Sequence, residues 1–428
     1  MDCDDPYVQE LAEKALQSRM GSRYRPVSSI SDLPSRSAPV FQYREYERLD
    51  FEHAMMNPTT SLTNAYIIRK ALIRKHYLTN TVANWVTKHP DSLLAKHVKA
   101  SVDFELDYAE FLDDALLEAY ELRESLEKNE SRPDSEKEWW ILKPGMSDRG
   151  QGIRLFNSED QLREIFEEWE VDTDDEDEDD DDEEQDNDDT DNVKTGVVTS
   201  QLRHFIAQPY IDPPLLLSSL NNRKFHIRTY VLATGALKVY VFKEMLALFA
   251  SKPYVSPTSS SEDSDINDPV ADLTRHLTNT CFQDKSVPES ETVRRFWDLP
   301  SNQLSNSKLS PTWKEDIYEQ ICGVTGELFT AAARGMMIHF QTVPNAFEVF
   351  GVDFLVDEGG SVWLLEVNAF PDFGQTGEEL RDVVVGGLFR GVVDVAVNGF
   401  FGGDGEKKSD QGDNGMRLVA DLDLGRKN

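Results

Sequence analysis

Asp353, Glu366 and Asn368 carry oxygen-bearing side chains in a segment that is otherwise largely apolar. Two apolar runs, Phe347 to Val356 and Ser361 to Val367, flank a short turn of acids and glycines. This pattern is typical of a β-hairpin. Two carboxylates on an apolar hairpin are costly unless a cation neutralises them. These residue types therefore favour a Mg²⁺ ion shared with phosphates, and the alternative is an exposed face on which the acids are hydrated.

The register of this hairpin decides whether the three side chains meet. We expect the turn to pair Val356 with Ser361, which places Asp353 opposite Leu364. Paired residues share one face of a sheet, and so do residues two positions apart along a strand. The side chains at 364, 366 and 368 are then predicted to lie on the same face as Asp353.

A magnesium site of this kind implies phosphate, and phosphate implies cations nearby. Lys143 follows the predicted buried strand Trp139 to Leu142 and opens a loop of small residues, which leads to a second predicted strand, Ile153 to Phe156. Backbone amides of such a loop, including those of Gly150 and Gly152, can line a phosphate chain. A lysine at a strand end is more often simply hydrated, so Lys143 supports a phosphate site only together with the other features.

A later predicted strand carries the third set of polar residues. Alternation places Lys224, His226 and Arg228 on one face and directs Phe225 and Ile227 to the core. A half-exposed strand shows the same alternation. The strand is therefore moderate evidence by itself, and the combination with the hairpin and the lysine loop is stronger.

The elements that must position these residues follow from apolar spacing. Apolar residues from Phe104 to Ala119 recur at spacings of three and four, which predicts an amphipathic helix. A second long helix is predicted from Trp313 to Ala331. Strands and helices alternate without a strict βαβ rhythm, so the pattern favours a mixed α/β (α+β) architecture.

The composition limits the classes of partner. The chain has 428 residues, with 79 Asp and Glu against 44 Lys and Arg, and a formal net charge of −35. Such a polyanion is a poor binder of nucleic acids and anionic membranes, and neither is expected as a partner. We find no apolar run long enough to predict a transmembrane helix and no secretory signal at the acidic N-terminus. Three widely spaced cysteines indicate a reducing compartment, so we expect a cytoplasmic protein.

Taken together, the motifs resemble those of the tubulin–tyrosine ligase family. They occur in the family's order between about residue 60 and residue 375. The motifs are Trp140–Pro144 with Gly150–Ile153, Gln208–Ile211, Arg223–Val231, His276–Asn279, and Asp353 with Glu366–Asn368. The fold that this resemblance implies is ATP-grasp, in which a central and a C-terminal module hold the nucleotide between them.

The chain is then predicted to divide into a flexible segment 1–37, an N-terminal domain 38–137, a central ATP-grasp module 138–212, a C-terminal ATP-grasp module 213–400 and a flexible tail 401–428. The central module contains a predicted disordered insert, 171–195, because residues 172–191 include 16 acids and no base. The C-terminal module contains a Ser- and Asp-rich loop, 256–268, that we expect to be mobile.

The resemblance also implies a role for each site residue. Lys224 and Arg228 would be catalytic and would face the phosphates and the substrate carboxylate. Asp353, Glu366 and Asn368 would hold Mg²⁺, in agreement with the hairpin argument. The ATP-binding set would comprise Lys75, Lys143 and Lys224 at the phosphates, Arg149, Gly150 and Gly152 in the loop, Gln208 with the backbone of Tyr210 and Ile211 at adenine, and Thr278 and Asn279 close to the nucleotide.

The activity that the resemblance implies is ATP-dependent ligation through an acyl phosphate, which an amino group then attacks to form a peptide or isopeptide bond. The amino-acid substrate would be tyrosine, and the protein acceptor would be tubulin. Two departures leave alternatives open, because His226 and Leu248 stand where the family's tyrosine ligase has Asp and Arg. The alternatives are glutamylation or glycylation, an acceptor other than tubulin, and a nucleotide-binding scaffold without ligase activity.

Overall fold

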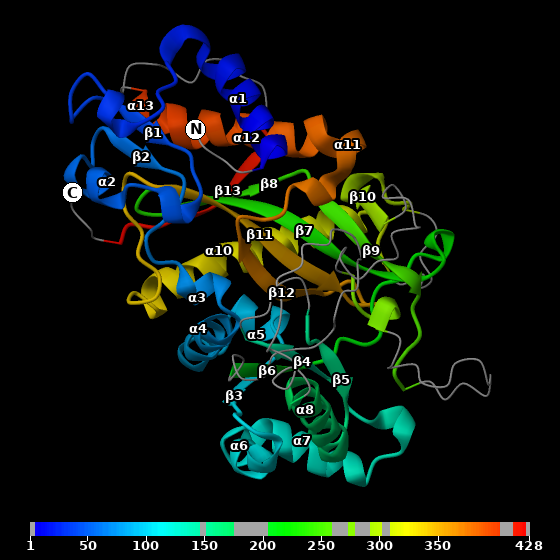
Figure 1. Cartoon of the computed structure of the whole chain (residues 1–428). Coiled ribbons are helices and arrows are strands. Elements are labelled where there is room, and N and C mark those ends of the chain that lie inside the picture. The colour runs from blue at the N-terminus through cyan, green and yellow to red at the C-terminus, as the bar shows by residue number, and fades with distance from the viewer. Residues whose placement is uncertain are drawn as a thin grey trace, which may run out of the picture.

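The computed structural model describes residues 5–145, 151–174, 204–258, 273–278, 292–301, 309–402 and 414–424 (Figure 1). Its described helices are α1 Pro6–Met20, α2 Phe51–Met56, α3 Lys70–Ile73, α4 Lys75–Lys88, α5 Leu93–His97, α6 Leu112–Glu118, α7 Tyr120–Glu130, α8 Glu159–Asp174, α10 Trp313–Gly335, α11 Gly377–Leu380, α12 Gly386–Val392 and α13 Asn398–Phe401. Its described strands are β1 Val40–Gln42, β2 Ser61–Thr63, β3 Val102–Glu105, β4 Trp140–Pro144, β5 Arg154–Phe156, β6 His204–Pro209, β7 Arg223–Thr234, β8 Lys238–Phe242, β9 Leu246–Pro253, β10 Val293–Arg295, β11 Phe347–Val356, β12 Val362–Ala369 and β13 Met416–Asp421. The mixed α/β architecture predicted from the sequence is confirmed.

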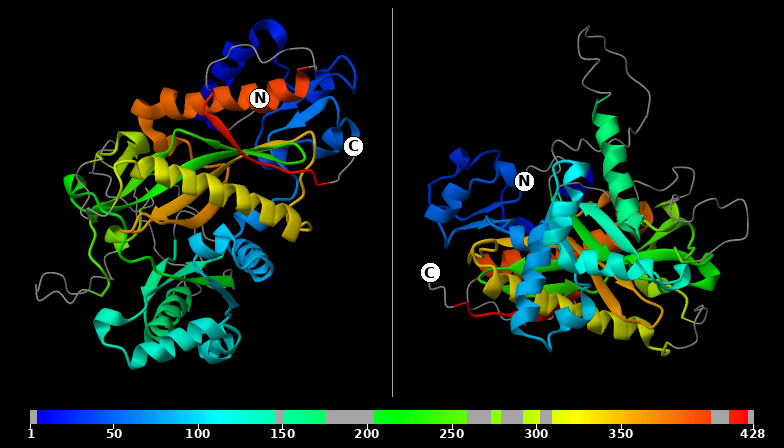
Figure 2. Two further views of the ribbon diagram at one scale, coloured as in Figure 1. Left: turned by 180° about the vertical axis from the view of Figure 1, so that it is seen from behind. Right: turned by 90° about the horizontal axis from the view of Figure 1, so that it is seen from below.

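The larger part of the molecule is built on a seven-stranded sheet. Its strand order is β10-β9-β7-β11-β12, and β8 and β13 extend it beside the second half of β7. Figure 2 shows α10 along one face of this sheet and α12 along the other. Along β7, Phe225 and Ile227 pack in the core beneath α10, whereas Tyr230 and Leu232 pack in the core beneath α12 and α1. Because both faces are covered, β7 is buried over almost its whole length, and the reading as a half-exposed strand is wrong.

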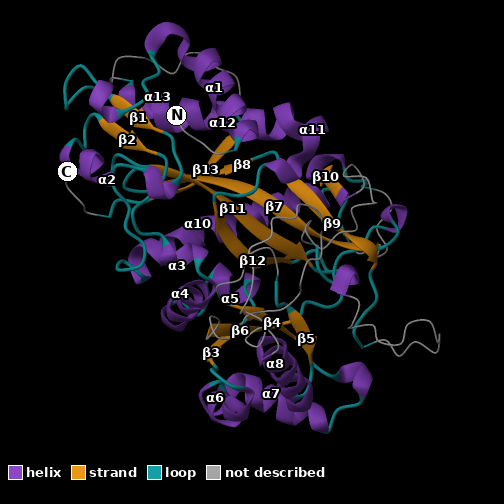
Figure 3. Cartoon of the chain, in the orientation of Figure 1, coloured by secondary structure: helices purple, strands orange, loops and turns teal. Residues whose placement is uncertain are grey.

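A smaller antiparallel sheet of order β3-β6-β4-β5 forms the second part of the molecule and lies below the large sheet in Figure 3. One of its faces packs against α6, α7 and α8 around Trp140, Phe205 and Trp169. The predicted single helix from Phe104 to Ala119 is wrong. Residues 102–105 alternate between buried and exposed and pair with β6, so Phe104 lies in a strand. The helices α6 and α7 begin only after this strand, and Tyr108 in the connection is 59% exposed.

Both chain ends contain more structure than predicted. Residues 6–20 form α1, which buries Leu11, Ala15 and Leu16 against α12. The apolar spacing of this segment is helical, so the expectation of a flexible 1–37 segment is wrong there. Near the other end, β13 pairs with β8 and approaches α10 so closely that a Cβ on Gly326 would lie 2.7 Å from a β13 carbonyl. The predicted flexible tail is therefore ordered over 414–424.

Two further expectations fall partly on residues that the structure does not describe. Helix α8 continues to Asp174 and so enters the first four positions of the predicted insert, and positions 175–195 lie outside the described residues. In the predicted mobile loop, Ser256 donates a hydrogen bond to Asp212 at 2.5 Å, whereas positions 259–268 lie outside the described residues.

One helical stretch, Gly374–Phe401, is long and apolar enough by length and composition to cross a membrane, and 56% of its most apolar window is buried. It contains π-helical turns at Arg381–Val385 and Val393–Val397. Its buried residues, including Leu388 and Phe389, belong to the core shared with α1 and the large sheet. The packing therefore accounts for its apolar character.

Candidate functional site

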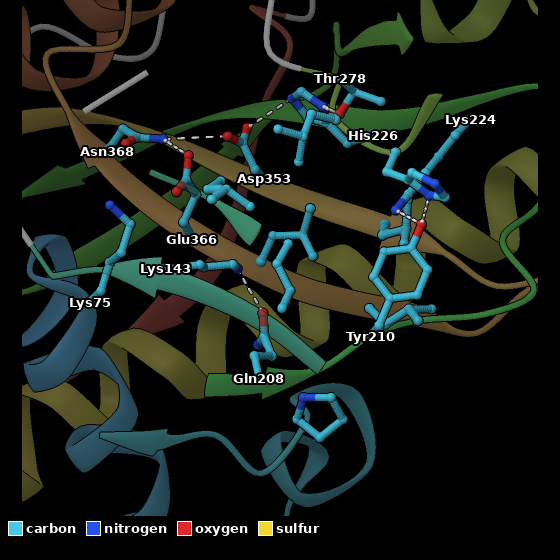
Figure 4. Close-up of a pocket in the computed structure, with 18 residues that line it drawn as sticks. Lys75, Lys143, Gln208, Tyr210, Lys224, His226, Thr278, Asp353, Glu366 and Asn368 are labelled. Carbon is cyan, nitrogen blue, oxygen red and sulfur yellow. Dashed lines mark hydrogen bonds and ion pairs between the residues drawn. The ribbon is translucent and has the colours of Figure 1, made fainter. Parts of the chain in front are cut away.

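A cavity of about 110 Å³, here called the central cavity, lies between the small sheet and the β11–β12 hairpin (Figure 4). It gathers side chains from segments that are far apart in the sequence. The predicted site residues that line it are Lys75, Lys143, Gln208, Tyr210, Ile211, Lys224, Thr278, Asp353, Glu366 and Asn368. The structure thus brings together most of the residues that the motifs suggested.

The other predicted residues have different positions. Arg228 does not line the central cavity, and its guanidinium is hydrogen-bonded to Asp353, which does. Gly152 adopts a positive φ of 70° in the turn before Ile153, which does line the cavity. Arg149, Gly150 and Asn279 lie outside the described residues.

The β11–β12 hairpin places its acids through a β-bulge, not through the predicted register. Val356 pairs with Val362 instead of Ser361, so the register at the turn differs by one residue from the prediction. If that register continued, Asp353 would oppose Leu365, and Glu366 would lie on the other face. The ladder shifts between Asp353 and Phe354, and Asp353 pairs directly with Glu366. The predicted register is therefore wrong, but the shared face is correct because of the bulge.

The three polar side chains on this face are here called the acid cluster: Asp353, Glu366 and Asn368. The Asn368 amide nitrogen lies 3.2 Å from Glu366 Oε1 and 3.4 Å from Asp353 Oδ2. Two carboxylates and an amide oxygen match the oxygen ligands that Mg²⁺ prefers. Among the described residues, no group of three His, Cys, Asp or Glu side chains is placed to hold a metal ion, so the Asn368 amide is needed to complete this set.

Asp353 also has a protein cation as its partner. Arg228 donates from Nε to Oδ1 at 2.5 Å and from its terminal nitrogen to Oδ2 at 2.9 Å. Asp353 is 3% exposed and Arg228 7% exposed. Burial alone would raise the pKa of Asp353, but the charge and hydrogen bonds of Arg228, together with His226 and Glu366, lower it. Two Arg228 nitrogens are directed at Asp353, and the role of Arg228 in facing the phosphates and the substrate carboxylate stays a prediction.

His226 lies between the acid cluster and Thr278. Its Nδ1 is 2.5 Å from Thr278 Oγ1, and its Nε2 is 3.7 Å from Asp353 Oδ1. Burial lowers the pKa of His226, which favours the neutral ring. Leu248, the second departure from the family pattern, pairs with His226 across β7 and β9 and is only 1% exposed. The position where the family's tyrosine ligase has Arg is therefore part of the apolar core.

Lys143 and Lys224, here called the lysine pair, are two cations of the central cavity whose pKa values are lowered. Lys143 Nζ donates to Gln208 Oε1 at 2.7 Å, and burial lowers the pKa of Lys143 to about 8. Lys224 Nζ donates to the Tyr210 hydroxyl at 2.9 Å, and burial lowers the pKa of Lys224 to about 7. Both ammonium groups have neutral hydrogen-bond partners, so a bound anion would favour their charged forms.

Lys75 and the segment after β6 complete the cavity. Figure 4 shows the Lys75 amino group on the side of the cavity where Glu366 and Asn368 lie. At the other end, the Tyr210 N–H donates to the Trp139 carbonyl at 2.8 Å. The Tyr210 amide is thus used in sheet pairing, and the contact of the Tyr210 and Ile211 backbone with adenine stays a prediction. The Tyr210 carbonyl and the Ile211 backbone are the groups left to contact a base.

Sequence reasoning missed several apolar residues that line the central cavity, among them Ile141, Leu355 and Leu365. It also gave His276 no separate role, although its Nδ1 lies 3.0 Å from the Tyr210 hydroxyl. Ile141 could have been found, because it lies two positions before Lys143 and alternation puts both on one face. Leu365 could not, because only the bulge exposes it to the cavity.

The chain is similar to proteins of one family over most of its length. The sequence model described as "Tubulin-tyrosine ligase family" matches residues 69–403. A probable tubulin–tyrosine ligase of Schizosaccharomyces pombe is 47% identical over 92% of this chain and 91% of its own length. The probable tubulin–tyrosine ligase PBY1 of Saccharomyces cerevisiae is 42% identical over 93% of this chain, which spans only 52% of that relative.

A solved structure gives the name of the fold. The C-terminal domain of Pby1 from K. lactis is described as an ATP-grasp enzyme that interacts with the mRNA decapping enzyme Dcp2. It is 36% identical, covers 99% of both chains and has a TM-score of 0.66. The ATP-grasp fold expected from the motifs is thereby confirmed.

Proposed function

From the premise that this chain belongs to the tubulin–tyrosine ligase family of ATP-grasp ligases, we propose that it joins tyrosine to a carboxylate of a protein, with tubulin as the first candidate acceptor. The observation that carries the proposal is the central cavity, where the lysine pair and the acid cluster face the same space. That combination suits a nucleotide triphosphate with its divalent cation.

The residues present fit both ligands. Lys143 and Lys224 are buried cations without an anionic hydrogen-bond partner, which is the chemistry of a phosphate site. The acid cluster provides oxygen ligands in the same cavity, and its carboxylates are held together by the Asn368 amide. ATP would supply a phosphoryl group that activates the acceptor carboxylate. The protein contributes positioning and charge neutralisation, and a protein nucleophile is not needed.

The identity of the acceptor is the finer part of the proposal. Tyrosine and tubulin are supported by the names of the S. pombe and S. cerevisiae relatives, both called probable tubulin–tyrosine ligases. His226 and the buried Leu248 remain the reason to test other acceptors. The K. lactis Pby1 domain interacts with the mRNA decapping enzyme Dcp2, which makes Dcp2 a second candidate partner. A cytoplasmic location is proposed from cysteine use, and the one described cysteine, Cys322, is a buried free thiol.

A ligation assay tests the proposal directly. The protein is incubated with ATP, Mg²⁺ and labelled tyrosine, glutamate or glycine, together with tubulin or a Dcp2 fragment. We expect labelled tyrosine on tubulin and ADP in equal amount. Labelling with glutamate or glycine would correct the amino acid, and labelling of Dcp2 alone would correct the acceptor. ATP binding without transfer to any protein would favour the nucleotide-binding scaffold.

Glu366→Gln is the variant that connects the assay with the acid cluster. It keeps the size of the side chain and removes one negative charge, so Mg²⁺-dependent turnover should fall at least tenfold. Binding of nucleotide without metal should stay the same or tighten, because a carboxylate that repels phosphate is removed. Turnover equal to that of the wild type would remove Glu366 from the proposed metal site.

A further inference from the structure

A second cavity adjoins the central cavity and has no role in the proposed function. Its volume is about 430 Å³, compared with about 110 Å³ for the central cavity. We call it the side cavity; its walls come mainly from α4, α5, the segment leading into β3, and β12. Small-molecule sites typically measure about 300–1,000 Å³, so the side cavity has the size of a ligand site.

The two cavities meet at the place where phosphates are proposed to bind. They share Lys75, Lys143, Gln208 and Leu365. Leu365 is the residue where the β12 register shifts, so the bulge that aligns the acid cluster also places a side chain at the junction. A molecule in the side cavity would therefore have one end next to the proposed reaction centre.

The wall of the side cavity is apolar in its middle. Leu78 and Val82 from α4 and Leu94 from α5 line it, and each is less than a tenth exposed. Val86 and Val98 are partly buried and pack against the same core. Such a wall favours an apolar or aromatic side chain by burying its surface.

Charges of both signs line the side cavity, and Lys99 is among the cations. Lys75 and Lys143 stand at the junction, where they would attract a carboxylate. Asp103, Glu118 and Glu121 line it elsewhere and are solvent-exposed. These acids would repel an acidic protein tail but not a zwitterion. The charge pattern therefore suits a free amino acid better than an acidic acceptor peptide.

We propose that the side cavity binds the amino-acid substrate, with its carboxylate toward Lys75, its amine at the junction and an apolar or aromatic side chain along the α4–α5 wall. This inference rests on the proposed function, since it concerns the second substrate of the same ligase. It assigns the apolar wall a role in selecting bulky amino acids over glutamate and glycine.

Filling the side cavity tests the proposal. Ala83→Trp on α4 and Ala95→Trp on α5 add bulk at exposed positions that line the cavity, so the core is not disturbed. The matched controls are Asn84→Trp and Lys96→Trp, which are exposed neighbours on the same helices that do not line it. Binding of labelled L-tyrosine, L-phenylalanine, L-glutamate and glycine is measured by equilibrium dialysis with saturating Mg²⁺ and a non-hydrolysable ATP analogue.

We expect L-tyrosine or L-phenylalanine to bind the wild type and both controls, and to bind both cavity variants at least tenfold more weakly. The thermal shift caused by the ATP analogue should be the same in all five proteins. Tyrosine binding that survives both cavity variants would overturn the proposal, as would preferential binding of glutamate or glycine. Absence of a thermal shift in the wild type would instead contradict the proposed function itself, so the two failures are distinguishable.

Discussion

In the acid cluster, Asp353 receives both hydrogen bonds of the Arg228 fork, whereas each member of the lysine pair donates to a neutral oxygen, of Gln208 or Tyr210. Burial raises the pKa of Asp353, but the charge and hydrogen bonds of Arg228, together with His226 and Glu366, lower it below its usual value. The pKa values of Lys143 and Lys224 are lowered by burial, which the nearby carboxylates, Glu366 and Asp353 for Lys143 and Asp212 for Lys224, offset only in part. Both regions hold buried charge, but only in the acid cluster is a buried charge, that of Asp353, hydrogen-bonded to a counter-ion.

This difference indicates what each region is for. A buried charge that the protein neutralises can serve as a fixed part of the fold, since removing its partner is strongly unfavourable. A buried cation whose hydrogen-bond partners are neutral is suited to binding an anionic ligand. Substituting the lysine pair should therefore weaken nucleotide binding, whereas breaking the Arg228–Asp353 pair should lower the free energy of unfolding. The following experiments test that contrast, starting with the largest effect.

Arg228→Met should have the largest effect on stability. The change leaves Asp353 buried without its counter-ion, and breaking such a pair typically costs about 3–5 kcal/mol. We expect this loss in urea unfolding at pH 7, and a smaller loss at pH 4, where the unpaired carboxyl can take up a proton. A combined Arg228→Met and Asp353→Leu variant should regain most of it. A loss below about 1 kcal/mol in the single variant would show that the pair does not anchor the hairpin.

Lys143→Met should show the opposite behaviour. Its free energy of unfolding without nucleotide should not fall, because the change removes a cation that burial disfavours. A nucleotide at about one hundred times its dissociation constant stabilises a protein by about 2.7 kcal/mol, and the variant should lose most of that thermal shift. Lys137→Met is the control, since Lys137 pairs with Asp134 at the surface and does not line the central cavity. Equal shifts in both variants would remove Lys143 from the phosphate site.

Nucleotide affinity should fall as pH rises. Burial lowers the pKa of Lys224 to about 7 and that of Lys143 to about 8, and bound phosphate should raise both. The full affinity is therefore present below about pH 7 and is lost as pH increases toward 9, by up to about tenfold per unit for each lysine. Titration calorimetry in two buffers should show proton uptake on binding. Lys143→Arg keeps its charge over this range and should give a shallower dependence.

Asp357→Asn should have the smallest effect. Asp357 lies at the hairpin turn, outside both charged regions, and accepts hydrogen bonds from the Ser361 amide and the Trp363 indole. An amide can keep part of this pattern, so the stability loss should stay below about 1 kcal/mol. Mg²⁺ dependence should not change. A change in Mg²⁺ dependence here, with none in Glu366→Gln, would place the metal site elsewhere on the hairpin.

The spacing of apolar residues predicted helices least reliably in short segments. Phe104 and Tyr108 are four positions apart, yet Phe104 lies in β3, where it pairs with Phe205 of β6. The helix α1 was missed although Val8, Leu11 and Ala15 have helical spacing, because the polar residues around it suggested a flexible end. In both cases the decisive contacts come from elements far away in the sequence.

The sequence by itself determined the members of the site. Local alternation fixes which side chains share a strand face, and the order of the motifs indicates which segments belong to one site. Lys143, Lys224 and Glu366 were identified in this way and do meet at the central cavity. Tertiary structure alone decided the bulge at Asp353, the commitment of Arg228 to that carboxylate and the existence of the side cavity. These features depend on packing between separate elements, and a one-residue shift in pairing or the choice of a charged partner leaves no periodic signal in the chain.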